Sequence, residues 1–132
     1  MRLLLDTNIF LEIVLEQERA PEAKSLLINA DQHEFFASDF SLHSIGLALF
    51  RPRRYEMFRV FVKDMLLVAG TTLLSLNVAD MGSVAVAAER FKLDFDDAYQ
   101  YVVAGKHNLT IVSFDSDFDR TERGRLTPAQ VE

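Results

Sequence analysis

Short apolar runs of strand length alternate along this chain with longer stretches whose apolar residues recur at helical spacing. The strand-length runs are residues 2–5, 34–37, 72–76 and 110–114. The helical stretches are residues 9–16, 21–30, 40–50, a segment from 55 onward, 81–91, and one that opens around 96–97. Parallel strands need such crossover helices between them. The sequence therefore predicts an α/β fold with a mostly parallel four- or five-stranded sheet flanked by helices.

Local capping residues support several of these boundaries. Pro21 suits the first turn of a helix, and Ser38 and Asp39 can cap the helix that follows the second strand. Pro52 helps to end that helix, and Asn108 is suited to end the last one. The segment 121–132 is polar, and we expect at most a short edge strand within this C-terminal tail.

The length and composition favour one domain over residues 1–132. A chain of 132 residues of which 49% are hydrophobic has enough apolar side chains to bury a core. No segment approaches the roughly 18 uninterrupted apolar residues of a membrane-spanning helix, and the N-terminus does not resemble a secretory signal. We therefore expect a soluble, cytoplasmic protein that does not associate with membranes.

The side chains available for metal binding are almost all oxygen donors. The chain has no cysteine, which excludes disulfides and thiolate metal sites. Its three histidines, His33, His43 and His107, lie far apart in the sequence. Carboxylate oxygens suit hard cations, so a metal site in this chain is expected to bind Mg²⁺ or Mn²⁺.

The net charge of −6 argues against a protein that binds nucleic acid through a broad basic surface. It does not exclude a nuclease, because a carboxylate metal site contributes several negative charges and its cation reverses the local field. The one dense basic run is RPRR at residues 51–54. Such a run is either ordinary solvated loop charge or a phosphate contact, and the sequence leaves both interpretations open.

Three aspartates occupy matching positions in the predicted topology. Asp6 and Asp115 each follow an apolar strand, and Asp97 lies near the start of a helix. The carboxyl ends of parallel strands meet at one edge of a sheet, where right-handed crossovers also place helix N-termini. Like charges gathered there need protons or a cation to neutralise them. The spacing therefore favours a shared acidic site that binds a divalent cation.

Each aspartate also has a local interpretation. Asp6 could cap the first helix, Asp97 could complement a helix dipole, and Asp115 could form a turn. Their coincidence in three topologically equivalent places favours the shared site. Asp94 and Asp96 are expected to act as helix caps. The role of Asp117 stays open.

Three segments resemble the PIN domain family, in the order in which that family carries them. They are LLLDTNIF at residues 3–10, DAYQ at 97–100 and IVSFDSDF at 111–118. The match is best for the single-domain, VapC-like group. The resemblance implies a three-layer sheet and helix architecture and a Mg²⁺- or Mn²⁺-dependent ribonuclease. It also implies, in many members, a toxin with a cognate antitoxin and a homodimeric state.

The resemblance also implies roles for individual residues. Asp6, Asp97 and Asp115 would be the catalytic metal ligands for RNA cleavage, with Asp117 helping directly or through water. Thr7 and Asn8 would orient ligands or substrate rather than take part in the chemistry. With Thr7 and Asn8, the sequence has every residue that the family leads us to expect at this site, except for one on the helix after the second strand.

The sequence departs from the family at that position. PIN nucleases usually carry a glutamate on the helix after the second strand, and Ser44 stands in its place. A hydroxyl brings no charge, so both metal affinity and activation of water are in question. His43 or Glu12 could substitute, although a solvated or hydrogen-bonded role is the ordinary one for each.

Other classes of protein fit the sequence less well. A PIN-like domain with a depleted metal site would act as an RNA-binding or protein-interaction module, and the serine and the acidic charge motivate that alternative. Phosphatases of the haloacid dehalogenase kind carry a second aspartate where this chain has Asn8. Receiver domains usually carry an adjacent acidic pair after the first strand and an aspartate after a middle strand. The sequence shows neither feature.

Overall fold

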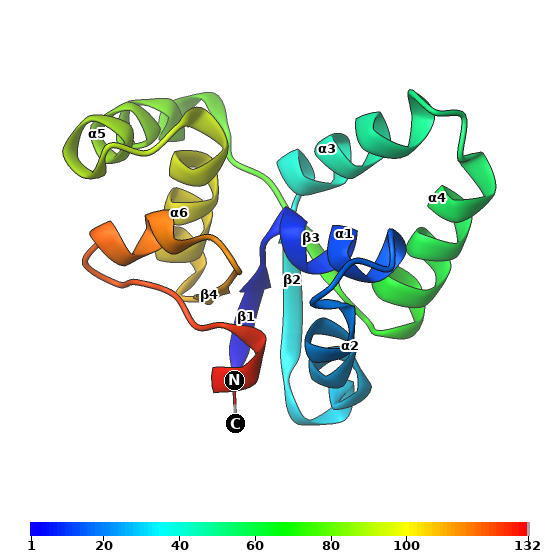
Figure 1. The fold of residues 1–132 in the computed structure, drawn as a ribbon. Helices are drawn as coiled ribbons and strands as arrows, with labels where there is room; N and C mark the ends of the chain where they lie inside the picture. Colours follow the sequence, from blue (N-terminus) through cyan, green and yellow to red (C-terminus); the bar gives the residue numbers. More distant parts are fainter. Residues whose placement is uncertain (132) are drawn as a thin grey trace.

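The centre of the molecule is a parallel four-stranded sheet (Figure 1). The computed structural model describes residues 1–131. The strands lie in the order β3-β2-β1-β4. Leu4 of β1 pairs with Phe36 of β2 on one side and with Ile111 of β4 on the other. The strand bounds are β1 (Arg2–Leu5), β2 (Glu34–Ser38), β3 (Thr72–Leu74) and β4 (Thr110–Val112).

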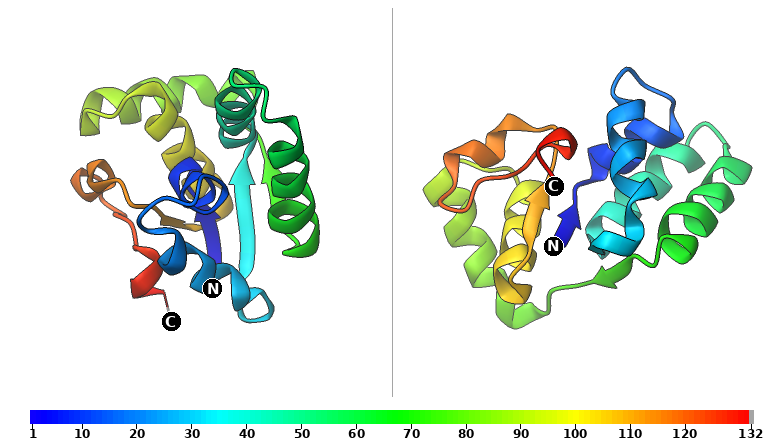
Figure 2. Two further views of the ribbon diagram at one scale, coloured as in Figure 1. Left: turned by 45° about the vertical axis from the view of Figure 1, so that its right-hand side comes forward. Right: turned by 90° about the horizontal axis from the view of Figure 1, so that it is seen from below.

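Helices cover both faces of this sheet, which gives three layers (Figures 1 and 2). In Figure 1 the helices α1 to α4 lie to the right of the sheet, and α5 and α6 lie to its left. The predicted parallel sheet flanked by helices is confirmed. The helix bounds are α1 (Thr7–Val14), α2 (Ala20–Ile28), α3 (Asp39–Phe50), α4 (Tyr55–Phe61), α5 (Met81–Phe91) and α6 (Phe95–His107).

The sheet separates two hydrophobic cores. Leu3 and Leu5 belong to the core under α1 to α4, whereas Leu4 belongs to the core under α5 and α6. All three leucines are fully buried. Successive side chains of a strand point to opposite faces, so a strand covered on both sides must be apolar at every position. This explains the uninterrupted leucine run of β1.

Two strands end earlier than the apolar runs predicted. β3 ends at Leu74 instead of residue 76, and β4 ends at Val112 instead of residue 114. The expected edge strand in the tail is reduced to one parallel bridge between Val112 and Leu126. It stops there because the chain soon enters a 3₁₀-helix, Pro128–Gln130, and its proline has no N–H to donate to a ladder.

The segment from residue 55 onward is not one regular helix. α4 ends at Phe61 and continues as a π-helix, Val62–Val68. Phe61 and Met65 are buried, as the apolar spacing predicted. The hydroxyl of Thr71 donates to the carbonyl of Met65 at 2.7 Å, which satisfies an acceptor near the end of the π-helix.

The helix boundaries near the predicted site follow their capping residues. α1 begins at Thr7, two residues before the expected start, because the Asp6 carboxylate accepts the Thr7 N–H. Asp94 caps α6 as predicted, by accepting the Asp97 N–H at 3.0 Å. Asp96 makes no cap and lies exposed in the first turn, so that expectation was wrong.

In the described residues, 1–131, no helix is both long enough and apolar enough to span a bilayer.

Candidate metal centre

Asp6 lies at the carboxyl end of β1 and is almost completely buried. Its Oδ1 accepts hydrogen bonds from the Thr7 N–H at 2.7 Å and from the Gln100 side-chain amide at 2.6 Å. Its Oδ2 accepts from the Ser113 hydroxyl at 2.6 Å and from the Asn8 amide at 3.3 Å. Both carboxylate oxygens are therefore held by donors from α1, α6 and the end of β4.

Asp115 and Asp117 come from the turn that follows β4. Asp115 Oδ1 accepts the Asp117 N–H at 2.8 Å, so it caps the short 3₁₀-helix Ser116–Arg120. The Asp115 N–H donates to the Ser113 hydroxyl at 2.9 Å. Ser113 thus contacts both Asp6 and Asp115. This one hydroxyl fixes the turn against the end of β1.

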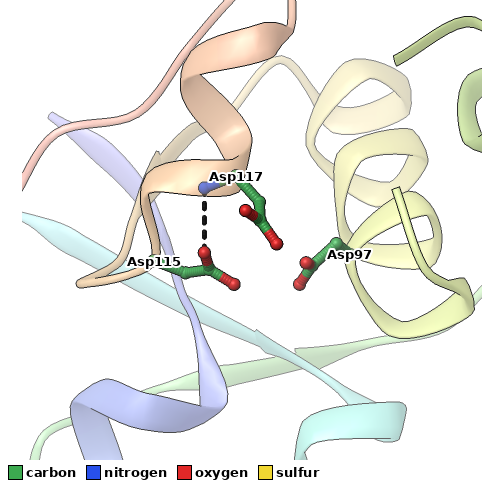
Figure 3. Close-up of side chains that lie close together, drawn as sticks. All are labelled: Asp97, Asp115 and Asp117. Atoms are coloured by element: carbon green, nitrogen blue, oxygen red, sulfur yellow. Dashed lines mark hydrogen bonds between the residues drawn. The ribbon is translucent and has the colours of Figure 1, made fainter. Parts of the chain in front are cut away.

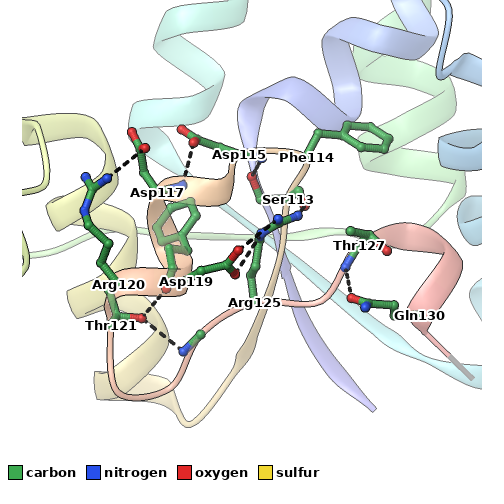
Figure 4. Close-up of polar contacts among 12 residues, drawn as sticks. Ser113, Phe114, Asp115, Asp117, Asp119, Arg120, Thr121, Arg125, Thr127 and Gln130 are labelled. Atoms are coloured by element: carbon green, nitrogen blue, oxygen red, sulfur yellow. Dashed lines mark hydrogen bonds and ion pairs between the residues drawn. The ribbon is translucent and has the colours of Figure 1, made fainter.

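Two arginines tie the same turn to its surroundings (Figure 4). Arg125 Nη1 donates to the Ser113 carbonyl at 3.0 Å, and its other nitrogens lie 3.2 Å from the Asp119 carboxylate. Arg120 Nη1 donates to Asp117 at 3.0 Å. The carboxylates of the turn are therefore positioned by side chains as well as by backbone.

Asp97 comes from the first turn of α6 and is only 7% exposed. Its carboxylate points toward Asp115 and Asp117 (Figure 3). One oxygen from each of these three carboxylates lies within 4.8 Å of the others. Three acids from two separate elements, α6 and the turn after β4, therefore converge at the carboxyl edge of the sheet.

The acids strongly affect one another's protonation. Burial, followed by the negative charges of Asp6, Asp94, Asp115 and Asp117, raises the pKa of Asp97 to about 8. Burial also raises the pKa of Asp6, although the hydrogen bonds from Ser113, Gln100 and Thr7 oppose this effect. A nearby cation would favour the charged forms of both groups.

The donor set fits a hard divalent cation. The converging atoms are all carboxylate oxygens, which are the ligands that Mg²⁺ and Mn²⁺ take in proteins. The raised pKa of Asp97 shows that this group is unfavourable when charged without a partner. Asp97, Asp115 and Asp117 could hold such an ion, with Asp6 beside them as a hydrogen-bonded carboxylate.

Asn8 contacts one acid of the site, whereas the Thr7 side chain contacts a neighbouring serine. Asn8 lies at the site, where its oxygen accepts the Phe114 N–H at 3.2 Å and its amide donates to Asp6 and Ser113. The Thr7 hydroxyl donates to Ser41 at 2.9 Å instead of to an acid. Both residues thus position other groups.

Neither residue considered as a substitute for the missing glutamate, His43 or Glu12, joins the converging acids. Ser44 is half-buried on α3, and His43 is exposed. His43 lines an apolar groove between α3 and α4 with Leu47 and Phe50. The Glu12 carboxylate accepts the Arg19 N–H at 2.9 Å and so binds the loop after α1. No carboxylate of α1 or α3 is part of the converging cluster.

Sequence reasoning missed Gln100, Ser113 and Ser41. All three are polar and essentially buried. Gln100 lies one turn after Asp97 among apolar positions of α6, and Ser113 interrupts the apolar run 110–114 that was predicted as the fourth strand. A polar residue inside a predicted buried face must find a partner, so these interruptions were the available signal.

The PIN domain model matches residues 3–124 of this sequence. The chain belongs to the PIN domain family. The match contains all four aspartates of the site, from Asp6 to Asp117. PIN domains are in general nucleases. The comparison with curated protein sequences gives no significant match.

Several solved structures share this fold over almost their whole length. VapBC2 from Rickettsia felis, bound to a promoter DNA fragment, has a TM-score of 0.77 at 14% identity, covering 96% of this chain and 97% of that chain. FitAcB from Neisseria gonorrhoeae has a TM-score of 0.75 at 17% identity, with coverages of 98% and 99%. A toxin-antitoxin complex from Klebsiella pneumoniae has a TM-score of 0.71 at 21% identity, with coverages of 97% and 98%. At these identities the likeness shows the fold.

Proposed function

We propose that this PIN domain is a ribonuclease that depends on Mg²⁺ or Mn²⁺ and hydrolyses RNA phosphodiester bonds. The observation that carries the proposal is the convergence of Asp97, Asp115 and Asp117 at the carboxyl edge of the sheet (Figure 3). Ligand sites of open parallel sheets lie at this edge. The raised pKa of Asp97 further supports a cation, which would remove the repulsion among the acids.

In this proposal the residues divide the work according to their contacts. Asp97, Asp115 and Asp117 would hold the ion, which when bound supplies an activated water and stabilises charge on the phosphate. Asp6, fixed by four donors, would orient groups at the site and add negative charge beside them. Asn8 would hold the start of α1 against the turn after β4.

The decisive variant is Asp97→Asn, which keeps the size of the side chain and removes its charge. We expect it to abolish Mn²⁺-dependent cleavage of a single-stranded RNA while the protein stays folded. Asp96→Asn is the matched control, because Asp96 lies in the same helical turn but is exposed and outside the cluster. Cleavage by a clean Asp97→Asn preparation at the wild-type rate would refute the proposal.

The same proposal extends to partners and location. The similar structure from Klebsiella pneumoniae is a toxin-antitoxin complex, which supports an antitoxin partner for this chain as well. We propose that the chain is the toxin of such a pair, forms a homodimer, and acts in the cytoplasm. Sedimentation of the purified chain would show whether it is dimeric. A toxin role requires that wild-type expression slows growth and that Asp97→Asn expression does not.

A second candidate function is a PIN domain with a depleted site that acts as an RNA-binding or protein-interaction module. The observation that favours it is Ser44, which leaves α3 without a carboxylate at the position where the family usually has one. Calorimetric titration with Mn²⁺ separates the two functions. Binding at or below millimolar metal supports the nuclease, and no binding in that range supports the module.

A further inference from the structure

A buried chain of side-chain hydrogen bonds leads from the start of α3 to Asp6. The hydroxyls of Ser38 and Thr7 donate to the Ser41 oxygen at 3.2 and 2.9 Å. The Ser41 hydroxyl donates to Gln100 Oε1 at 3.3 Å, and Gln100 Nε2 donates to Asp6 Oδ1 at 2.6 Å. Every donor in the chain points toward the aspartate.

This chain fixes the orientation of the Gln100 amide. Because the Asp6 carboxylate can only accept hydrogen bonds, the nitrogen of Gln100 faces Asp6 and its oxygen faces Ser41. The Ser41 hydroxyl then gives its proton to Gln100 and accepts from Thr7 and Ser38. Gln100 is 1% exposed and Ser41 is fully buried, so water does not compete for these bonds. Hydrogen bonds in such a setting reinforce one another.

Gln100 also links two acids of the site. It lies three residues after Asp97, on the same face of α6, and its amide contacts the carboxylate that ends β1. The Gln100 contact therefore sets the position of α6, and with it Asp97, relative to Asp6. An apolar residue of the same size would fill the space but make no hydrogen bond to Asp6. It would therefore not fix the distance between α6 and the end of β1.

We propose that Gln100 is a positioning residue of this site, held by Ser41, which fixes the Asp6 carboxylate beside the metal-binding acids. The inference rests on the proposed function. Gln100 does not touch the ion or the RNA in this role. It acts through Asp6, in the way that partners of metal-site carboxylates commonly affect metal affinity by about 10- to 100-fold.

The first test needs neither metal nor RNA. The Thr7 N–H donates to the same oxygen of Asp6 at 2.7 Å, so its amide resonance reports the position of that carboxylate. In the metal-free protein, Gln100→Met should shift the Thr7 amide proton resonance. Ser41→Ala also removes the partner of the Thr7 hydroxyl, so its effect is measured at the Gln100 side-chain amide, which should shift. Tyr99→Phe is the matched control, because Tyr99 is the adjacent residue of α6 and its hydroxyl contacts Asp39 and Leu76 instead of Asp6.

The second test measures the consequence for metal affinity by calorimetric titration with Mn²⁺ alone. We expect Gln100→Met to weaken Mn²⁺ binding by about tenfold and Tyr99→Phe to leave it unchanged. In an Asp6→Ala background the same Gln100→Met change should have no further effect, because Gln100 acts only through Asp6.

The results that would overturn the inference are distinct from those that would refute the nuclease. An unshifted Thr7 amide in folded Gln100→Met, an unshifted Gln100 side-chain amide in folded Ser41→Ala, or an equal loss of Mn²⁺ affinity with and without Asp6 overturns the role of Gln100. A wild-type protein that binds no Mn²⁺ or cuts no RNA refutes the proposed function, and the Thr7 resonance still decides whether Gln100 positions Asp6.

Discussion

Arg120 Nη1 lies 3.0 Å from Asp117 Oδ1, and the same guanidinium also reaches across to the end of α5. Its Nε donates to the Phe91 carbonyl at 3.0 Å and its Nη2 donates to the Lys92 carbonyl at 2.6 Å. One side chain therefore joins the turn that carries Asp117 to the last residues of a helix. The position of this metal-ligand candidate depends on α5, although α5 contributes no acid to the site.

Removing the guanidinium of Arg120 should destabilise the fold. We expect Arg120→Met to lower the free energy of unfolding by about 1–2 kcal/mol, because the carbonyls of Phe91 and Lys92 lose their donor. Arg59→Met is the matched control, since Arg59 makes a similar exposed ion pair with Glu56 at 2.9 Å. That pair should contribute under about 0.5 kcal/mol. Equal effects of the two substitutions in urea denaturation would contradict this account.

The metal-free protein should lose stability as the pH rises from about 4 to 8. The pKa of Asp97 is about 8 in the folded chain against 3.8 as its ordinary value, so the folded state holds this proton more tightly. The stabilisation is complete below the ordinary pKa and is lost as the pH passes through the folded one. Asp97→Asn should remove this dependence.

Chemical denaturation in EDTA at pH 5 and pH 8 measures the effect of Asp97 directly. The stability of wild type relative to Asp97→Asn should fall by on the order of 2 kcal/mol between these pH values, less than an isolated group would give, because the neighbouring acids titrate together. The comparison between variants cancels the contributions of other groups. If the difference in stability between the two proteins is constant across this pH range, the pKa of Asp97 is not raised in the metal-free fold.

Mn²⁺ should stabilise the protein against heat, and more strongly at pH 8 than at pH 6. A ligand that binds only the folded state contributes about 2.7 kcal/mol at one hundred times its dissociation constant. At pH 6 the ion must displace the proton of Asp97, whose pKa is about 8. Differential scanning calorimetry with and without Mn²⁺ measures both shifts. The account fails here if Asp97→Asn shows the same stabilisation as wild type.

Adding a carboxylate at Ser44 should strengthen metal binding. Ser44 lies one turn after Ser41, which faces the site through Gln100. We expect Ser44→Glu to lower the Mn²⁺ dissociation constant by about tenfold, and to lower the stability of the metal-free protein because another negative charge joins the acids. His43→Glu is the control, since His43 is exposed on α3. Equal effects at both positions would show that the added charge acts only at long range.

The sheet and its acidic edge could be predicted because they follow from patterns along single elements. β1 carries three successive leucines because helices cover both faces of the sheet. Asp6 marks the end of that apolar run. The placement of Asp97 and Asp115 at one edge follows from the winding of parallel strands. These inferences require only the order of the elements.

The hydrogen-bond partners of the acids could not be predicted in the same way. Gln100 and Ser41 are 59 residues apart in sequence and meet only after α3 and α6 have packed together. Ser113 contacts Asp6 across 107 positions. The early end of β4 has a similar cause, because Ser113 turns to Asp6 and Asp115 where the apolar run predicted a longer strand.

A crystal structure grown with Mn²⁺ tests the central claim most directly, through the anomalous scattering of the metal. The account predicts a Mn²⁺ peak bound by carboxylate oxygens of Asp97, Asp115 and Asp117, with Asp6 still hydrogen-bonded to Gln100 and Ser113. A Mn²⁺ peak elsewhere on the protein, or no peak at millimolar metal, would contradict it.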